Sequence, residues 1–411
     1  MQAARTDRIR ASVTRRPAWG MAACCLCAVA LCACGCAITP RQRQVAAFRA
    51  ALDHVEHDYI VGVDRRGLQR AAMRALVDEL DDPYSAYLTP EQMQREFENQ
   101  DGAFGGIGLV TMRDHGLPVV VRTLPGGPAQ AAGIRAGDVI THADGRDLRD
   151  LSADDVMGLL RGRGGTRLRL RLRRHDEPDT IVLTITRQRI VLPNVECRTV
   201  EEHIGYVHIL AFHDRCAREV RDALQQLLGE GIKGLVLDLR GDGGGSVHQA
   251  LAVCDMLLNE GVIVVEKGRE LERERRASAH VLVPRDMPIV ILVDPGTASA
   301  AEIVAGAMQA CGRARLVGMR TFGKGSGTIL RPLPDGSGVR VTGRRYELSG
   351  GVPIEGRGIE PDVVVGDLSP LRAEATAEEV VRWRQAKDAL ERKQLNVALE
   401  CLRKELQQLG E

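Results

Sequence analysis

The chain has few aromatic residues and almost no net charge. Phe, Trp and Tyr make up 3% of its 411 residues, and the formal net charge is +1 at pH 7. Proteins that bind nucleic acid usually need basic patches for the phosphates, and those that hold single strands stack bases on aromatic side chains. The arginines at 167–173 alternate with leucine, which is typical of an amphipathic strand. The composition therefore predicts no nucleic-acid partner.

Cysteine pairs of the kind that bind metal are also missing from most of the chain. Six of the eleven cysteines lie between residues 24 and 36, and no Cys-x-x-Cys pair occurs after them. This spacing argues against a structural zinc site or a dense disulfide framework, and no organic cofactor is indicated either. We expect the remaining five, widely spaced, to be single buried thiols: Cys197, Cys216, Cys254, Cys311 and Cys401.

Residues 1–37 have the layout of a signal peptide or of a membrane or lipid anchor. A basic region precedes residues 17–37, which carry no charge and are rich in Ala, Cys and Leu. The segments 31–34 and 33–36 resemble bacterial lipoprotein cleavage sites. We therefore expect an exported protein of the bacterial cell envelope, periplasmic or attached to the membrane. Cleavage, lipidation and retention of the leader remain open.

Four further units follow the leader. In the first unit, apolar residues recur at helical spacing. The second unit has short strands with a small helix, which suggests a binding module. In the third unit, strands alternate with helices, which indicates an α/β domain. The last unit is charged and helical, which suggests docking or a homodimer through terminal helices. Their ranges are 43–100, 103–190, 191–366 and 369–411.

Ser299 and Lys324 are the candidate nucleophile and base. The apolar strand 289–293 is followed by a break, and Ser299 then opens a run of small residues with helical character. A serine at such a strand-to-helix turn can serve as a nucleophile. Arginine, which dominates this domain, cannot act as a base, whereas a lysine can once burial has lowered its pKa. The alternative is structural, because Ser299 and Glu302 also form a capping-box sequence.

Other hydrolase arrangements find less support in the sequence. The Gly-x-Ser-x-Gly elbow of the α/β-hydrolases is absent. No histidine lies near Ser299 in the sequence, although His213 and His248 could approach it in space.

A glycine-rich loop after the strand 234–239 could stabilise an oxyanion. Backbone N–H groups of Gly243–Gly245, with the N–H of Ala300 at a helix N-terminus, are suitable donors. Such a loop could instead bind phosphate, but the chain has neither a Walker arrangement nor a Gly-x-Gly-x-x-Gly fingerprint here.

A second glycine cluster, at 105–109, is the candidate for binding substrate. Successive glycine N–H groups can form a nest for a terminal carboxylate, and a neighbouring strand edge can accept an extended peptide. The alternative is an ordinary hairpin. The predicted contact residues are Gly106, Ile107, Gly108 and Leu109.

Five motifs in this order resemble those of the C-terminal processing peptidases, also called tail-specific proteases. They are the turn 80–85, the loop 106–108, the segment 127–140 with its Ala-Gly-Ile-Arg-Ala-Gly-Asp run, the loop 238–245, and Ser299 with Lys324 and 356–362. The resemblance covers residues 43–366. It implies a multidomain α/β and α+β protein with an N-terminal helical segment, a PDZ domain, a crotonase/ClpP-like α/β serine protease core and C-terminal helices.

The same resemblance implies roles for single residues. Ser299 would be the nucleophile and Lys324 the general base, with Gly244 and Ala300 as oxyanion donors. Two positions depart from the family pattern. Thr328 stands where the family has a glutamine that orients the lysine, and Gly243 stands where it has a proline. These departures suggest lower activity or altered gating of substrate.

Three functions are compatible with these patterns. The first is an exported serine endopeptidase that binds the C-terminal tail of protein substrates through its PDZ domain. The second is a PDZ adaptor, catalytically weak or inactive, on the same scaffold. The third is an acyl-transfer enzyme of crotonase type, which would not need the unit at 103–190. The sequence favours the endopeptidase.

Overall fold

The computed structural model describes residues 39–278, 281–369 and 377–410. The chain divides into two compact units, residues 1–76 and 77–411. The predicted leader at 1–37 lies outside the described residues. Within those residues, no helix combines the length and the apolar character needed to cross a membrane.

The first unit holds helix α2 (Pro40–Asp58) and most of α3 (Arg65–Asp78). Thr39 begins α2 with a capping box, in which its side chain and that of Gln42 each accept a backbone N–H of the other residue. Arg65 donates to Asp53 at 2.9 Å and also pairs with Glu56, which ties the two helices together. The helical character predicted for 43–100 is thus present, continued by α4 (Pro90–Asp101), but a short strand, β1 (Ala86–Leu88), interrupts it.

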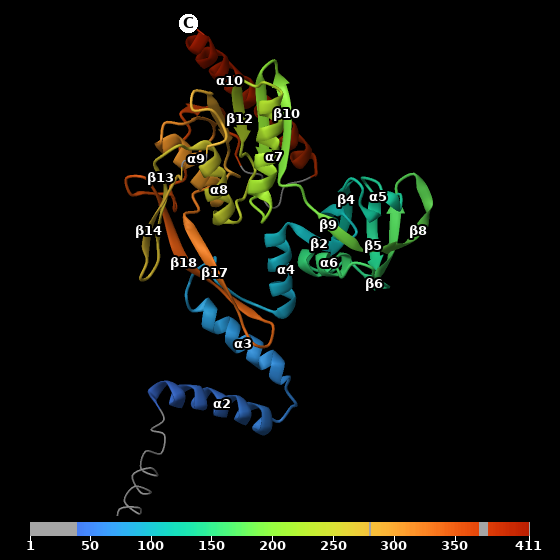
Figure 1. Cartoon of the computed structure of the whole chain (residues 1–411). Helices are drawn as coiled ribbons and strands as arrows, with labels where there is room; N and C mark the ends of the chain where they lie inside the picture. Colours follow the sequence, from blue (N-terminus) through green and yellow to red (C-terminus); the bar gives the residue numbers. More distant parts are fainter. Residues whose placement is uncertain (1–38, 279–280, 370–376, 411) are drawn as a thin grey trace, which may run out of the picture. The chain divides into compact units, whose positions relative to one another are not determined.

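The second unit contains a small antiparallel domain (Figure 1). Its sheet has the order β3–β4–β5–β7–β8, with β6 beside β5, so β3 is an edge strand. Leu168, Leu170 and Leu172 of β7 are fully buried while the intervening arginines are exposed, as their alternation predicted. The bounds are β3 (Leu109–Asp114), β4 (Leu117–Thr123), α5 (Pro128–Ala131), β5 (Val139–Ala143), β6 (Arg146–Asp147), α6 (Ala153–Leu160), β7 (Arg167–Arg174) and β8 (Glu177–Thr186).

Two strands flank this domain at its beginning and end. β2 (Ala103–Gly106) pairs with β9 (Gln188–Val191) in an antiparallel ribbon of their own. Gly105 and Gly106 of the predicted glycine cluster 105–109 therefore belong to a strand.

The larger domain is built on a sheet of order β10–β11–β12–β15–β16–β20, parallel except for β10. Alternating strands and helices predicted this α/β arrangement. The strands are β10 (Val195–Glu201), β11 (Ile204–Ile209), β12 (Gly234–Asp238), β15 (Ile289–Val293), β16 (Arg315–Gly318) and β20 (Val363–Val364). The strand predicted at 289–293 has these same bounds in the structure.

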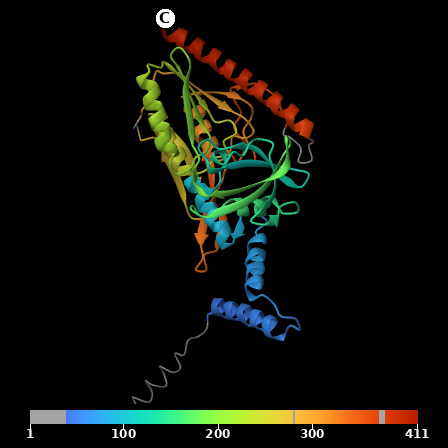
Figure 2. The same ribbon diagram turned by 90° about the vertical axis from the view of Figure 1, so that its right-hand side faces the viewer.

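Helices cover both faces of this sheet. The inward residues of one face pack with α7 (Cys216–Gly229), α8 (Val247–Leu257) and α9 (Ala300–Ala310) in a large apolar core. The other face, which includes Val236, Val290 and Leu292, packs against Ala398, Leu399 and Leu402 of α10 (Ala377–Gly410). Figure 2 shows the long α10 along one side of this domain. The expected C-terminal helices are a single helix over residues 377–410.

A second sheet of the same domain has the order β1–β18–β13–β14, and β17 and β19 also pair with β18. Its strands are β13 (Val262–Lys267), β14 (Glu272–Arg276), β17 (Ser326–Pro332), β18 (Gly338–Leu348) and β19 (Val352–Pro353). Through β1 it brings the turn at residues 81–85 toward β18, where Ser85 Oγ accepts the N–H of Thr342 at 3.1 Å.

Candidate active site

Three loops meet at the carboxyl ends of neighbouring parallel strands. β12 leads into the glycine-rich loop 240–245, β15 into the turn that carries Ser299, and β16 into the segment that carries Lys324. Leu237 pairs with Ile291, and Ile291 with Leu316, so the three strands are in register side by side. Open parallel sheets place their ligands at this edge.

Ser299 has a backbone conformation that is rare for a residue with a side chain. Its φ is 55° and its ψ is −114°, immediately before α9. Such strain costs on the order of 1–3 kcal/mol and persists where the surrounding structure imposes it, often at functional sites. A simple helix cap has extended backbone angles instead. The strained turn thus favours the nucleophile interpretation of Ser299 over a purely structural cap.

Glu302 joins the Ser299 turn to the Lys324 loop. Its fully buried carboxylate accepts the N–H of Ser299 and the N–H of Lys324 on the same oxygen, Oε2, each at 2.8 Å. The two backbone nitrogens are therefore no further apart than twice this distance. Oε1 accepts the N–H of Gly323 at 2.7 Å and the hydroxyl of Thr321 at 2.5 Å.

These four hydrogen bonds explain how a charged side chain can be buried here, because each lone pair finds a donor. The carboxylate of the predicted capping box is thus used to bring the candidate nucleophile and base together. The sequence did not reveal this role, since Thr321, Gly323 and Lys324 are about 20 residues away from Glu302.

Lys324 is half-buried, and its Nζ lies 4.4 Å from the centre of the Tyr84 ring. No carboxylate lies within ion-pair distance of this amine among residues 39–278, 281–369 and 377–410. Burial raises the pKa of Tyr84, and the charges of Glu355, Asp82 and Glu302 add to the effect, so the ring faces the amine as a neutral phenol. The sequence analysis missed Tyr84 as a site residue; its position in the family-like turn 80–85 was the available signal.

The glycine-rich loop packs directly on the Ser299 turn. A Cβ added to Gly244 would lie 2.7 Å from Ala298 O and 2.9 Å from both Ser299 Cβ and Ala300 N. Gly244 also has a φ of +94°, so glycine is required there for two reasons. Gly244 and Ala300, the predicted oxyanion donors, are therefore adjacent. In this conformation the Gly244 N–H donates to Asp242 Oδ1 at 2.8 Å.

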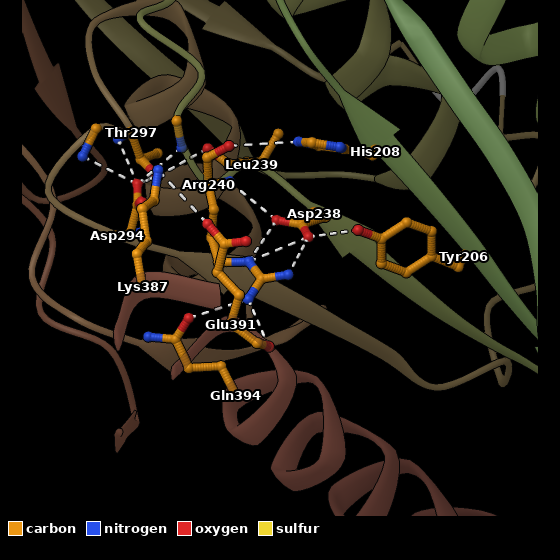
Figure 3. Close-up of polar contacts among 12 residues, drawn as sticks. Tyr206, His208, Asp238, Leu239, Arg240, Asp294, Thr297, Lys387, Glu391 and Gln394 are labelled. Atoms are coloured by element: carbon orange, nitrogen blue, oxygen red, sulfur yellow. Dashed lines mark hydrogen bonds and ion pairs between the residues drawn. The ribbon is translucent and has the colours of Figure 1, made fainter. Parts of the chain in front are cut away.

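Arg240 anchors the start of this loop to α10 (Figure 3). Its guanidinium donates to the buried Asp238 carboxylate, to Glu391 O at 2.8 Å and to Gln394 Oε1 at 3.1 Å. Tyr206 donates to Asp238 at 2.6 Å. Burial opposes the charge on Asp238, but the Arg240 contacts outweigh it and hold the pKa of Asp238 below its usual value. This network fixes the backbone two residues before Asp242.

The remaining candidates lie elsewhere. Thr328 is exposed on β17, beside a register shift, and makes no hydrogen bond with Lys324 within the described part of the chain. His213 packs beside Gly102, and His248 is exposed on α8. Neither histidine is hydrogen-bonded to Ser299 in the residues that the structure describes.

The predicted carboxylate loop connects β2 to β3 in the small domain. Ile107 is buried, Gly108 has a φ of +75°, and their carbonyls accept the N–H groups of Ala129 and Leu124. A groove of about 120 Å³ lies between the edge strand β3 and helix α6, lined by Thr111, Met112, Arg113, Pro118, Ala153, Val156 and Met157. An edge strand beside an apolar groove is suited to binding an extended peptide by strand addition.

A strained serine turn joined to a lysine loop by Glu302, a glycine loop and a small domain suited to strand addition are compatible with a serine peptidase that has a peptide-binding domain. Residues 203–365 match the model of peptidase family S41, and residues 119–174 match that of a PDZ domain.

Two curated relatives and one solved structure support the same assignment. The chain is 35% identical over 318 residues to the chloroplastic C-terminal processing peptidase of Tetradesmus obliquus, covering 73% of this chain and 68% of that protein. It is 34% identical over 310 residues to a probable CtpA-like serine protease of Staphylococcus aureus (strain COL), covering 75% of this chain and 62% of that protein. The solved photosystem II D1 C-terminal processing protease is similar with 31% identity and a TM-score of 0.50, covering 82% of this chain and 90% of that one.

The chain belongs to peptidase family S41, among the C-terminal processing peptidases with a PDZ domain. It spans about three fifths of the length of the staphylococcal relative. The resemblance predicted from the sequence motifs, and the multidomain fold that it implied, are both confirmed.

Proposed function

We propose that this protein is an exported serine endopeptidase that binds the C-terminal tails of protein substrates through its PDZ domain and cleaves them with Ser299 and Lys324. The observation that carries the proposal is the shared hydrogen bonding to Glu302 Oε2, which holds the backbones of these two residues together. The exported location rests on the leader alone.

In the proposed reaction, side chains transfer the proton and backbone N–H groups stabilise the negative charge that develops on the substrate. Ser299 Oγ attacks the scissile carbonyl carbon while its proton moves to the amine of Lys324, which acts as the base. The oxyanion that forms is stabilised by N–H groups of Ala300 and Gly244. Collapse of this intermediate breaks the C–N bond, and the leaving amine takes the proton from Lys324. Water then hydrolyses the acyl-enzyme by the same sequence.

Substitution of either residue tests the mechanism. Ser299→Ala and Lys324→Ala should each lower kcat for an unstructured-tail substrate by roughly 10³-fold or more, since the two residues act as a unit. The controls Ser349→Ala and Lys404→Ala make the same chemical changes at exposed positions and should retain activity. Thermal unfolding verifies that all four variants fold. Full activity of Ser299→Ala or Lys324→Ala would rule out this mechanism.

A second candidate function is tail binding without turnover. It is favoured by one observation, that the N–H of Gly244, a proposed oxyanion donor, donates its hydrogen bond to Asp242 Oδ1. Time-resolved mass spectrometry separates the two functions, because an adaptor binds the tail and releases it unchanged.

A further inference from the structure

Asp242 lies in the loop that follows β12, next to the proposed oxyanion site. Its backbone is held on both sides: its N–H donates to Leu239 O at 3.3 Å, and its carbonyl accepts the N–H of Ala298 at 2.9 Å. Because Ala298 precedes Ser299, this second bond ties Asp242 to the nucleophile turn. The side chain therefore has little freedom to leave the site.

The Asp242 carboxyl group is fully buried and only half satisfied. Oδ1 accepts the N–H of Gly244 at 2.8 Å, while Oδ2 has no hydrogen-bond partner among the described residues. A buried carboxylate with an unpaired oxygen is costly, so the neutral acid is favoured. Burial raises the pKa of Asp242 to about 8, against a smaller opposing effect of the Gly244 hydrogen bond.

Among the described residues, the groups that face Asp242 from the packed elements do not supply a compensating cation. Burial raises the pKa of the Cys216 thiol of α7, and the charges of Asp242 and then Glu219 add to the effect. Cys216 and Asp242 are therefore near each other. Asp294, after β15, accepts the N–H of Gly241 at 2.8 Å. Within the same loop Arg240 is already paired with Asp238. Ionisation of Asp242 thus adds an unpaired negative charge.

Gly244 links this carboxyl group to the chemistry. Its carbonyl is held by the N–H of Phe212 at 3.0 Å, and a Cβ added to Gly244 would lie 2.9 Å from Ser299 Cβ. To bind an oxyanion, the Gly244 N–H must turn away from Asp242, and Gly243, which replaces a stiffening proline, gives the peptide freedom to do so. A hydrogen bond to a carboxylate is about twice as strong as one to a neutral carbonyl.

We propose that Asp242 is a positioning residue that competes with the reacting carbonyl oxygen for the N–H of Gly244, and that its ionised form keeps the oxyanion site closed. This inference rests on the proposed function. The neutral acid releases the Gly244 N–H more readily and adds no charge beside the developing oxyanion. Cleavage is therefore lost as pH rises through the range in which Asp242 ionises.

The pH profile of cleavage by the full chain is the first test. Wild-type kcat should fall about fivefold between pH 8 and pH 9, and further above pH 9 toward the roughly 10²-fold loss expected when one oxyanion donor is withdrawn. Asp242→Asn keeps the shape and an acceptor for Gly244 but cannot ionise, so its kcat should not fall over this range. Asp222→Asn makes the same change on the exposed face of α7 and should retain the wild-type decline. Mass spectrometry after the assay excludes deamidation at the new Asn-Gly sequence.

The second test needs no turnover. The measurement is an NMR pH titration of Ser299→Ala protein that carries glycine labelled with ¹³C at the carbonyl and with ¹⁵N. In this protein, only the amides of glycines that follow another glycine are selected. The signal that changes in Asp242→Asn is assigned to Gly244. This signal should shift with pH along the titration of Asp242, and the shift should vanish in the double variant. An unmoved Gly244 signal overturns the inference, as does an unchanged alkaline decline in Asp242→Asn. Absence of cleavage at every pH with a Gly244 signal that does titrate would instead refute the proposed function alone.

Discussion

At the scale of single residues, the candidate site depends on two buried carboxyl groups with opposite environments. Glu302 is buried but accepts four hydrogen bonds, from three backbone N–H groups and one hydroxyl. Asp242 is equally buried and accepts one. The second group, with few donors around it, is favoured as a neutral acid, because burial raises the pKa of Asp242 to about 8. The difference between the two carboxyl groups follows from the number of hydrogen-bond donors around each of them.

The raised pKa of Asp242 predicts a stability that falls with pH. The unfolded chain loses this proton near the ordinary pKa of 3.8, and the folded chain loses it near 8, so between these values the folded state binds one more proton. The contribution is fully present below pH 3.8 and is lost as pH rises through 8. Each unit of pH in this window removes at most about 1.4 kcal/mol of unfolding free energy.

Chemical denaturation at pH 5 and pH 9 measures the effect. The quantity to compare is the unfolding free energy of Asp242→Asn minus that of wild type. This difference should be larger at pH 9 than at pH 5, because all other titrating groups are shared by the two proteins and cancel. An equal difference at both values of pH would show that Asp242 is ionised in the folded protein.

At the scale of elements, strong apolar patterns in the protease domain predict a strand at 289–293 and helices at 217–228 and 247–258. The structure has the first helix as α7 (Cys216–Gly229) and the second as α8 (Val247–Leu257). The sequence could not predict which sheet face α10 would cover, because an apolar stripe on a helix does not determine the surface on which it packs. That surface is the sheet face of β12, β15 and β16.

The docking of α10 can be tested with one buried and one exposed leucine of the same helix. Leu402 is fully buried near Gly234, whereas Leu409 is 61% exposed. Leu402→Ala should lower the free energy of unfolding by about 2–5 kcal/mol, through lost burial and the cavity left behind. Leu409→Ala should change it by about 0.5 kcal/mol or less. Denaturant unfolding measures both, and equal effects would contradict the docked arrangement.

At the scale of the whole molecule, motif order predicted more than any motif alone. The glycine loop, Ser299 and Lys324 follow three strands that neighbour one another, so parallel pairing brings them to one edge. The contacts of Tyr84 with Lys324 and of Asp242 with Gly244 were not predicted. The first joins residues 240 positions apart, and the second depends on a loop conformation that composition does not determine.

The PDZ domain makes a prediction about substrate that does not depend on the protease chemistry. If the loop at 106–109 and the groove beside β3 bind a terminal carboxylate, its charge contributes to affinity through backbone N–H donors. A substrate tail ending in a free carboxylate should therefore have a KM about tenfold or more lower than the same tail ending in an amide, the effect expected of a hydrogen-bonded charge. kcat should be similar for both tails, because the scissile bond and the Ser299 environment are unchanged. Steady-state kinetics with the paired peptides makes the comparison. Equal KM values would mean that the chain end is not what this protein recognises.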